Sequence, residues 1–358
     1  MKNEDEKYIA RCIQLAKNGQ QEAAPNPMVG AVIVYEGRII GEGFHIRCGE
    51  AHAEVNAIQS VEDKTLLPMS TIYVSLEPCS HYGKTPPCAD LIIKHRIKRV
   101  VVGCVDPFPK VAGRGIQKLR AAGIDVTVGV LEEQCIALNQ QFITSNLKKR
   151  PYIILKWAES ADHFIDKKRT GGTPVLFSTN LSHIITHKRR AETMAILVGG
   201  NTALLDNPSL STRHWGGKNP IRVVIDRSRK LPLTLQLFDG TIPTLCFTEK
   251  EEKVALKNVT FVQLNQTESV LSQLLHYLNT HKIQTLLVEG GALLLQLFIQ
   301  SNLWDEAHVE SSPIILEDGV KAPQINSFKR RSIEQRKETI YLHYYRSDCQ
   351  SIRNLSSL

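Results

Sequence analysis

A chain of 358 residues is long for one hydrophobic core, so its length favours two domains of ordinary size. Hydrophobic residues make up 42% of the chain and charged residues 22%, as in soluble globular proteins. No apolar run reaches the roughly 18 residues that cross a bilayer, and the charged N-terminus leads into a helix-like segment rather than an apolar signal core. We therefore expect a cytoplasmic protein with no membrane partner.

The formal net charge of +8 does not identify a partner. It is divided between residues 1–150 (+3) and 151–358 (+5), and nowhere forms a basic tail. Anionic small molecules such as a phosphorylated substrate or a dinucleotide explain it as well as nucleic acid does. The eight cysteines are spread along the chain, unlike a disulfide framework, so a cysteine near a histidine motif is a metal candidate.

Hydrophobic periodicity in the first half predicts alternating helices and strands. Helices are expected at 5–18, 51–60, 88–95 and 115–122, and strands at 29–34, 38–43, 71–75, 99–105 and 124–128. Glu36 and Gly37 predict the turn between the first two strands. Alternation of this kind implies a sheet covered by helices.

A polar, basic stretch at 146–151, ending in a proline, interrupts this pattern and predicts a linker. We place the first domain at 1–147 and the second at 148–358. A second α/β unit follows the linker. Its strands are expected at 152–157, 195–198, 221–225, 244–247 and 285–288, and its helices near 180–191 and 268–280.

The strongest chemical motif is His-Ala-Glu at 52–54 followed by Pro-Cys at 78–79 and 87–88. We predict that His52, Cys79 and Cys88 bind zinc and leave its fourth tetrahedral position to water, as in catalytic zinc sites. Such water ionises near neutral pH and becomes a nucleophile. Glu54 would carry its proton to the leaving nitrogen without binding the metal. This order of residues is typical of zinc deaminases that act on nucleobases.

The alternative reading is two buried thiols and a surface histidine. It is disfavoured because the histidine motif opens a predicted helix and the first Pro-Cys follows a predicted strand. The spacing is also informative. Eight residues separate Cys79 from Cys88, where the nucleic-acid pattern has two. This insertion places His81 and Lys84 beside the predicted metal, and a lysine in a Gly-Lys-Thr turn suits a phosphate.

The run Glu-Pro-Cys-Ser-His-Tyr-Gly-Lys-Thr-Pro-Pro-Cys at 77–88 resembles the signature of the bifunctional riboflavin-biosynthesis deaminase–reductases. Residues 25–30 and 111–115 match other stretches of that family. The resemblance implies a cytidine-deaminase-like three-layer first domain and a diaminopyrimidinone substrate that carries a phosphoribosylamino group. It also implies that Asn26 contacts the ring and that His45, His81 and Lys84 help to hold the base or phosphate. For His45, a partly exposed strand histidine is the plain alternative.

In the second half, glycine pairs follow two predicted strands, at 199–200 and 290–291. Each pair could let backbone amides approach a phosphate at the start of a helix, or could simply form a turn. No G-x-G-x-x-G follows a strand, so the residues alone predict no Rossmann dinucleotide site.

Ordered matches from Lys156 to Gly291 make this half similar to the family's reductase domain. That similarity implies a dihydrofolate-reductase-like α/β fold and NADPH as cofactor. The implied reaction is hydride delivery to C1′ of the open ribosylamine, an imine, which gives a ribitylamino chain. Residues implied to line the cofactor are Ala158, Thr202, Asp206, Gly290, Gly291, Ala292 and Leu293. Those implied to face the substrate are Lys156, Arg190, Leu210, Arg213 and Glu289.

Plain alternatives remain for the charged residues of this half. Arg190 and Arg213 could be solvated surface arginines, and Glu289 an acid favoured by a helix N-terminus. Two departures from the family pattern stand out. His163 replaces a glycine, which would add strain if its φ were positive, and residues 174–178 lack the usual serine and tryptophan.

Two other functions remain open. One is a nucleic-acid-editing deaminase with a basic second module, which the long cysteine spacing and the 6% aromatic content disfavour. The other is a deaminase whose second domain only assembles an oligomer. We expect a bifunctional enzyme that uses Zn²⁺ and NADPH. Its partner would be a phosphorylated pyrimidine, not nucleic acid, and the chain would form a homo-oligomer.

Overall fold

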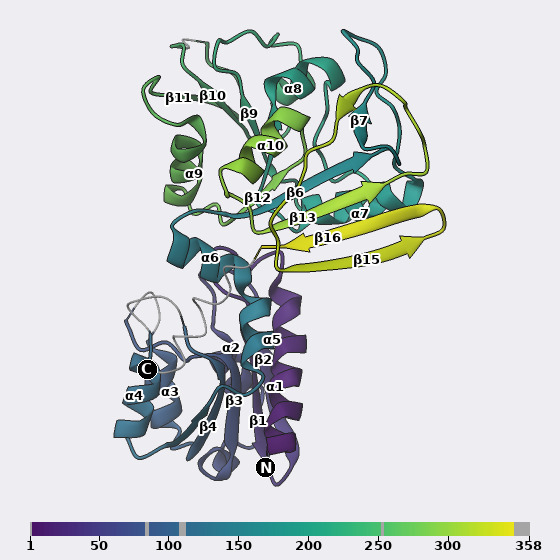
Figure 1. The fold of residues 1–358 in the computed structure, drawn as a ribbon. Coiled ribbons are helices and arrows are strands. Elements are labelled where there is room, and N and C mark those ends of the chain that lie inside the picture. Colours follow the sequence, from purple (N-terminus) through teal and green to yellow (C-terminus); the bar gives the residue numbers. More distant parts are fainter. Residues whose placement is uncertain (1, 83–85, 107–111, 252–253, 347–358) are drawn as a thin grey trace. The chain divides into compact units, whose positions relative to one another are not determined.

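The computed structural model describes residues 2–82, 86–106, 112–251 and 254–346, and Figure 1 shows its fold. The chain divides into two compact units, the first ending at Lys149 and the second beginning at Arg150. Residues 146–148, expected as the start of the linker, form the end of the last helix of the first unit. In the described ranges, no helix is long and apolar enough to span a membrane.

The described strands of the first unit form one sheet in the order β2-β1-β3-β4-β5. They are β1 (Gly30–Tyr35), β2 (Arg38–Phe44), β3 (Thr71–Leu76), β4 (Arg99–Cys104) and β5 (Asp125–Val128). β1 is antiparallel to β2 and β3, whereas β3, β4 and β5 are parallel. Glu36 and Gly37 form the two-residue turn of the β1–β2 hairpin, and their positive φ values of 47° and 73° match the twist of such a hairpin.

Helices cover both faces of this sheet, as β1 illustrates. Its Ala31 and Ile33 pack in a cluster with residues of α2, α3 and α4, while Val32 and Val34 pack in a second cluster with α1 and α5. This alternation follows from the two-residue period of a strand. The helices are α1 (Lys2–Ala16), α2 (Ala53–Ser60), α3 (Cys88–Lys94), α4 (Arg114–Ala121), α5 (Glu132–Leu138) and α6 (Gln140–Lys148). The first unit is therefore a three-layer α/β/α domain.

The main sheet of the second unit has the order β11-β10-β9-β8-β12-β6-β13-β16-β15. All neighbours from β11 to β13 are parallel, and β16 and β15 extend the sheet antiparallel. Its strands are β6 (Tyr152–Glu159), β8 (Ala195–Gly199), β9 (Ile221–Ile225), β10 (Thr244–Thr248), β11 (Val259–Gln263), β12 (Thr285–Val288), β13 (Glu306–Ser311), β15 (Arg330–Arg336) and β16 (Thr339–Tyr345). A separate pair joins β7 (Phe164–Asp166) to β14 (Val320–Lys321).

Helices also cover both faces of the second sheet. They are α7 (Asn180–Ala191), α8 (Gly200–Asp206), α9 (Val270–Thr280) and α10 (Ala292–Gln300). Ile153 and Leu155 of β6 pack with residues of α9 and α10, whereas Tyr152 and Ile154 pack in a second cluster that includes a residue of α8. Lys156, two residues after Ile154, points to this second face. The parallel strands end at one edge of the sheet, where open α/β sheets bind their ligands.

Candidate functional site

Three potential metal ligands converge in the first unit. His52 is the N-cap of α2, Cys79 follows β3, and Cys88 begins α3. Nδ1 of His52 lies 3.3 Å from Sγ of Cys88 and 3.6 Å from Sγ of Cys79. The three ligand atoms lie within 4.8 Å of one another, the one such cluster in the part of the chain that the structure describes. One imidazole and two thiols suit tetrahedral zinc with an open fourth position.

The electrostatics of this cluster also suit a metal. The Cys88 thiol and His52 lower the pKa of Cys79 to about 4, although burial opposes them. The backbone N–H of Cys88 donates to Sγ of Cys79 over 3.3 Å, which stabilises the thiolate further. Because the thiolate is the form that binds metals, Cys79 is ready to bind a cation at neutral pH.

Glu54 lies in the first turn of α2 and is only 3% exposed. Burial and the neighbouring Cys79 raise its pKa to about 7. A carboxyl group with a pKa close to the operating pH is suited to taking up and releasing a proton.

Of the other residues predicted for this site, His45 and Asn26 are hydrogen-bonded to each other beside His52, whereas His81 lies at the surface. His45 is buried, and its Nδ1 donates to the backbone oxygen of Ala51 over 3.0 Å. Its Nε2 therefore accepts from Nδ2 of Asn26 over 3.1 Å, and its ring centroid lies 5.5 Å from that of His52. Burial lowers the pKa of His45, which keeps the ring neutral. His81 is exposed, and Lys84 lies outside the described residues.

Sequence reasoning missed Glu77, which organises the backbone beside the metal cluster. Its carboxylate accepts hydrogen bonds from the backbone N–H groups of Asp106 (3.2 Å), Gly113 (2.9 Å), Gly115 (2.8 Å) and Ile116 (3.3 Å). A Cβ on Gly115 would lie 2.0 Å from the oxygen of Pro78, so this contact requires glycine. The Gly-Arg-Gly run at 113–115 was the available signal.

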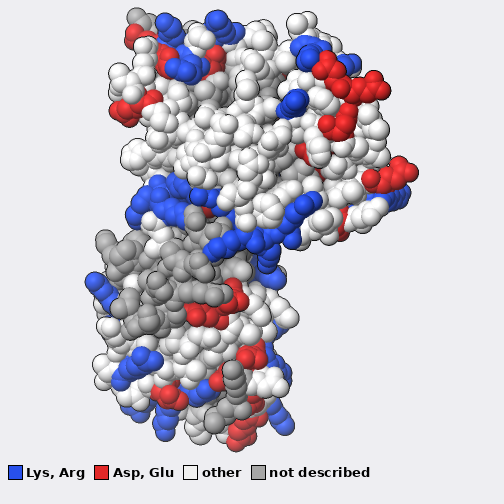
Figure 2. Space-filling view, viewed as in Figure 1, with Lys and Arg blue, Asp and Glu red and all other residues white. Residues whose placement is uncertain are grey.

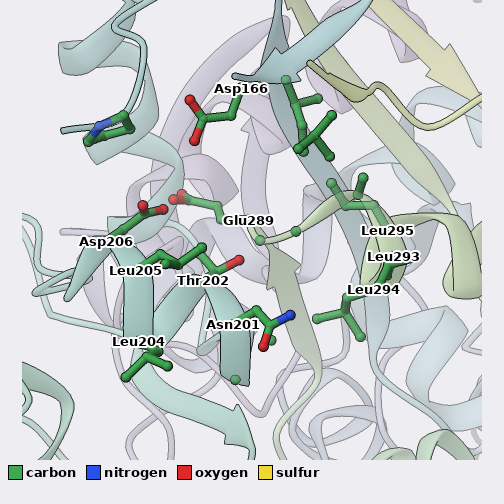
Figure 3. A pocket seen from close by; sticks show the side chains of 18 of the residues that line it. Asp166, Asn201, Thr202, Leu204, Leu205, Asp206, Glu289, Leu293, Leu294 and Leu295 are labelled. Carbon is green, nitrogen blue, oxygen red and sulfur yellow. The ribbon is translucent and has the colours of Figure 1, made fainter. Parts of the chain in front are cut away.

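The second unit contains a cavity of about 730 Å³ at the carboxyl ends of its parallel strands (Figure 3). Nine residues predicted for the cofactor or the substrate line it: Lys156, Ala158, Thr202, Asp206, Glu289, Gly290, Gly291, Ala292 and Leu293. They come from β6, from α8, from the segment that joins β12 to α10, and from the first turn of α10. A volume of this size is within the range of pockets that bind small molecules and cofactors.

The glycine pair at 290–291 is required where the cavity meets α10. Gly291 has a φ of 69°, which disfavours other residues. A Cβ on Gly290 would lie 3.0 Å from the side chain of Val198. The pair therefore does more than turn the chain, because it brings backbone close to the N-terminus of α10, where anions bind favourably.

The remaining predicted residues do not line this cavity, and of these Arg190 contacts a residue that does. Arg190 forms a bidentate ion pair with Glu289, with Nε–Oε1 at 3.0 Å and Nη2–Oε2 at 2.6 Å. Arg213 is exposed and donates to Oγ of Ser209 over 2.8 Å. The side chain of Leu210 is 2% exposed and packs in the core, and its φ is 49°, so the side chain itself does not face a ligand.

Arg169 is a residue of this cavity that sequence reasoning missed. Its buried side chain bridges Asp166 (Nε–Oδ2, 2.6 Å) and Asp206, and so ties the segment after β7 to the end of α8. Asp206 therefore meets the cavity already paired with a cation. No sequence pattern links Arg169 to a residue 37 positions away.

His163 does adopt the backbone conformation that glycine favours. Its φ is 64°, and its Nδ1 contacts Oε1 of buried Glu159 over 2.8 Å. The other oxygen of Glu159 accepts from Nε1 of Trp157 over 2.7 Å. The strain expected from a non-glycine residue here is thus offset in part by a local hydrogen bond.

Comparison with known proteins relates each unit to a known family. The family model of the cytidine and deoxycytidylate deaminase zinc-binding region matches residues 2–104, and that of the RibD C-terminal domain matches 151–340. Riboflavin biosynthesis protein RibD of Aquifex aeolicus is 39% identical over 337 residues, covering 92% of each chain. The RibD of Chlamydia pneumoniae is 41% identical over 325 residues, covering 87% of this chain and 85% of that one.

A crystal structure from Thermotoga maritima is also similar, with a TM-score of 0.86 and 35% identity, covering 97% of this chain and 99% of that one. That protein is described as a diaminohydroxyphosphoribosylaminopyrimidine deaminase and 5-amino-6-(5-phosphoribosylamino)uracil reductase.

Fold and sites together define a bifunctional enzyme in which a zinc-dependent deaminase domain is joined to an NADPH-dependent, dihydrofolate-reductase-like domain. The chain belongs to the RibD family of riboflavin biosynthesis proteins. The predicted fold class, the two activities and the two cofactors are therefore confirmed.

Proposed function

We propose that the first unit deaminates a diaminopyrimidinone that carries a phosphoribosylamino group, and that the second unit reduces the ribosyl chain of the deaminated product to ribityl. The observation that carries this proposal is the convergence of His52, Cys79 and Cys88 beside the buried Glu54. The description of the Thermotoga maritima relative supports both substrates.

In the deaminase, His52, Cys79 and Cys88 would hold the zinc, which when bound supplies an ionisable water as nucleophile. The Glu54 carboxylate takes up a proton and releases it to the leaving amino nitrogen, and its burial keeps that proton from exchanging with bulk water. The hydrogen bond from Asn26 fixes the neutral His45 ring, so these two side chains position the pyrimidine. His81 and Lys84 are assigned to the substrate on the family resemblance alone.

In the reductase, NADPH when bound supplies a hydride. We assign its binding to Ala158, Thr202, Asp206 and residues 290–293, which line the cavity around the start of α10. Lys156 and the Arg190–Glu289 pair are assigned to the substrate. Arg213 and Leu210 are assigned to it on the family resemblance alone. The substrate phosphate would face the arginines, because guanidinium groups match phosphate geometry.

The order of the two steps provides the test. With the aminated substrate, ammonia release should proceed without NADPH, and NADPH oxidation should begin only after deamination. With the deaminated intermediate supplied directly, NADPH oxidation should begin at once. NADPH oxidation with no ammonia release would contradict the proposal, and so would ammonia release without any subsequent reduction. Removal of the 5′-phosphate should lower kcat/KM in both half-reactions.

The two activities should separate along the chain. Fragment 1–147 should bind zinc and deaminate, and fragment 148–358 should bind NADPH and reduce only the deaminated compound. This division is supported by the boundary between the two compact units, at residues 149 and 150. Full-length point variants guard against a fragment that aggregates. If Glu54→Gln abolished the reduction of supplied intermediate, the two-site division would be wrong.

We further propose that the enzyme is a cytoplasmic homo-oligomer that does not act on nucleic acid. The eight residues between Cys79 and Cys88 support a small-molecule substrate. Figure 2 shows Lys and Arg side chains gathered in a band on the drawn face, a charge that suits a phosphorylated small molecule as well. Light scattering after size-exclusion chromatography tests the oligomer, since a monomer at micromolar concentration would contradict it. Deamination of a single-stranded oligonucleotide would contradict the substrate assignment.

A further inference from the structure

Lys156 lies between the large cavity and a second, small one. Its side chain lines the cavity of about 730 Å³ on one side and a cavity of about 20 Å³ on the other. The second cavity is lined by further residues of α7, β13 and β16, and its volume is enough for about one water molecule. The charged or titratable groups around Lys156 are Arg189, Arg190 and His183 of α7, Glu289 after β12, His308 and Glu310 of β13, and Tyr341 and His343 of β16.

A buried lysine in these surroundings needs an anion to keep its proton. Burial lowers the pKa of Lys156, and the neighbouring Arg190 and Arg189 lower it as well, whereas Glu289 and Glu310 raise it. The charge state of Lys156 therefore depends on whether either carboxylate is available to it.

Glu289 is already committed to another cation. Both of its oxygens bind Arg190, over 3.0 and 2.6 Å, in a pair whose side chains are only 12% and 9% exposed. Glu289 raises the pKa of Lys156 more than Glu310 does, but its charge is shared with the Arg190 guanidinium, so it does not serve the lysine alone.

Glu310 is the uncommitted carboxylate. It is 3% exposed, and its Oε2 accepts from Oγ of Ser178 over 2.8 Å. Its Oε1 is buried and has no hydrogen-bond partner. Among the described residues, it is the one buried side-chain nitrogen or oxygen atom without such a partner. A buried carboxylate oxygen without a hydrogen bond destabilises the folded protein, which points to a partner nearby.

The sheet places Glu310 next to Lys156. On the adjacent parallel strands β6 and β13, His308 pairs with Lys156 and Glu310 pairs with Ala158. Since residues two apart share a face, the Lys156 and Glu310 side chains lie on the same face as diagonal neighbours, within reach of two long side chains. Both line the small cavity, where one water could also bridge them.

We propose that Glu310 is the counter-ion of Lys156, a positioning residue that keeps the lysine ammonium charged and directed into the reductase cavity. This inference rests on the proposed reductase function. Through Ser178, Glu310 also ties Lys156 to the segment at 174–178, part of which lines the same cavity and departs from the family pattern. The Glu310 carboxylate thus contacts that segment through Ser178 and, on this proposal, also stabilises the charge of Lys156.

The titration of Lys156 tests this directly and requires no substrate. Full-length protein is acetylated with trace acetic anhydride across a pH series, and Lys156 modification is quantified by mass spectrometry. In Glu310→Gln the midpoint should fall by about one pH unit or more, because an opposite charge has been removed. Glu306→Gln is the matched control. Glu306 lies on the same strand but binds His308 and Tyr152, so its loss should leave the Lys156 midpoint unchanged.

The alkaline limb of the reductase pH profile should move with that midpoint, while deamination stays unchanged. If Glu310→Gln does not fold, Glu310→Asp retains the charge and should hold the midpoint within half a pH unit of wild type. An unchanged midpoint in folded Glu310→Gln would overturn the inference, and so would a midpoint in Glu310→Asp that falls by a full unit. A wild-type enzyme that fails to reduce the intermediate would instead contradict the proposed function, and the labelling would still report on Glu310.

Discussion

The Arg190–Glu289 pair should couple the stability of the second unit to its activity. We consider Arg190→Met, Glu289→Leu and the double variant. Removing one partner of a buried ion pair typically costs about 3–5 kcal/mol, because the other charge is left uncompensated. The structure favours the lower end, about 3 kcal/mol for each single variant. In Glu289→Leu, Arg190 still donates a hydrogen bond to the backbone oxygen of Ser211 (3.1 Å). In Arg190→Met, the positive charge of Lys156 still stabilises the Glu289 carboxylate.

The double variant should cost far less than the two single costs added together. Two apolar side chains of similar size can replace a buried pair with little loss. We therefore expect a coupling energy of at least about 2 kcal/mol between the two positions. Reductase activity should nevertheless be lost in all three variants, because both groups are assigned to the substrate.

Urea unfolding monitored by tryptophan fluorescence isolates the relevant unit. The three tryptophans, Trp157, Trp215 and Trp304, all lie in the second unit, so the signal is not mixed with the unfolding of the first. Additive single costs would refute the coupling. A double variant that retains reductase kcat/KM within tenfold of wild type would refute the substrate role of the pair.

Three further predictions concern both units. Cys88→Ser should lose most of the zinc found by elemental analysis, together with deamination, and full zinc occupancy would place the third ligand elsewhere. Glu54→Gln should retain zinc but lower the deamination rate by about 10²–10⁴, and a rate within tenfold of wild type would contradict its role. Burial lowers the pKa of His308 to about 4, so the unfolded chain takes up this proton first as the pH falls. The free energy of unfolding of the second unit should therefore fall between pH 6.5 and pH 4, by about 2 kcal/mol at pH 5. In urea unfolding, His308→Gln should show a smaller decrease over the same pH range.

Hydrophobic periodicity within a short stretch of sequence predicted several strands and helices of the fold. The strands at 221–225 and 285–288 and the helix at 180–191 were predicted with the bounds that the structure has. The convergence of His52, Cys79 and Cys88 was predictable because a metal site of this kind needs few residue types in a fixed order, each placed after a strand or at the start of a helix.

The elements that were missed lacked such signals. In α10, Leu293 is 83% exposed and Leu297 45% exposed, while Leu295 and Phe298 are buried, so a uniformly apolar sequence hid the face that packs. The contacts of Arg169 with Asp206 and of Glu310 with Ser178 join residues far apart in the chain. They depend on the order of strands in the sheet, which no local pattern specifies.

The strand order of the second unit also has a consequence for protein synthesis. Tyr152 of β6 pairs with Thr285 of β12, 133 residues further along (285 − 152), and β13 covers the other edge of β6. The first strand of this unit therefore emerges from the ribosome long before either neighbour exists. In the first unit, by contrast, β1 meets β2 across a two-residue turn and β3 soon after, so its contacts close early. A nascent chain can thus complete its deaminase domain while β6 still lacks both of its neighbouring strands. A polypeptide that ends before β13 would therefore carry a folded deaminase domain joined to an incomplete, aggregation-prone sheet.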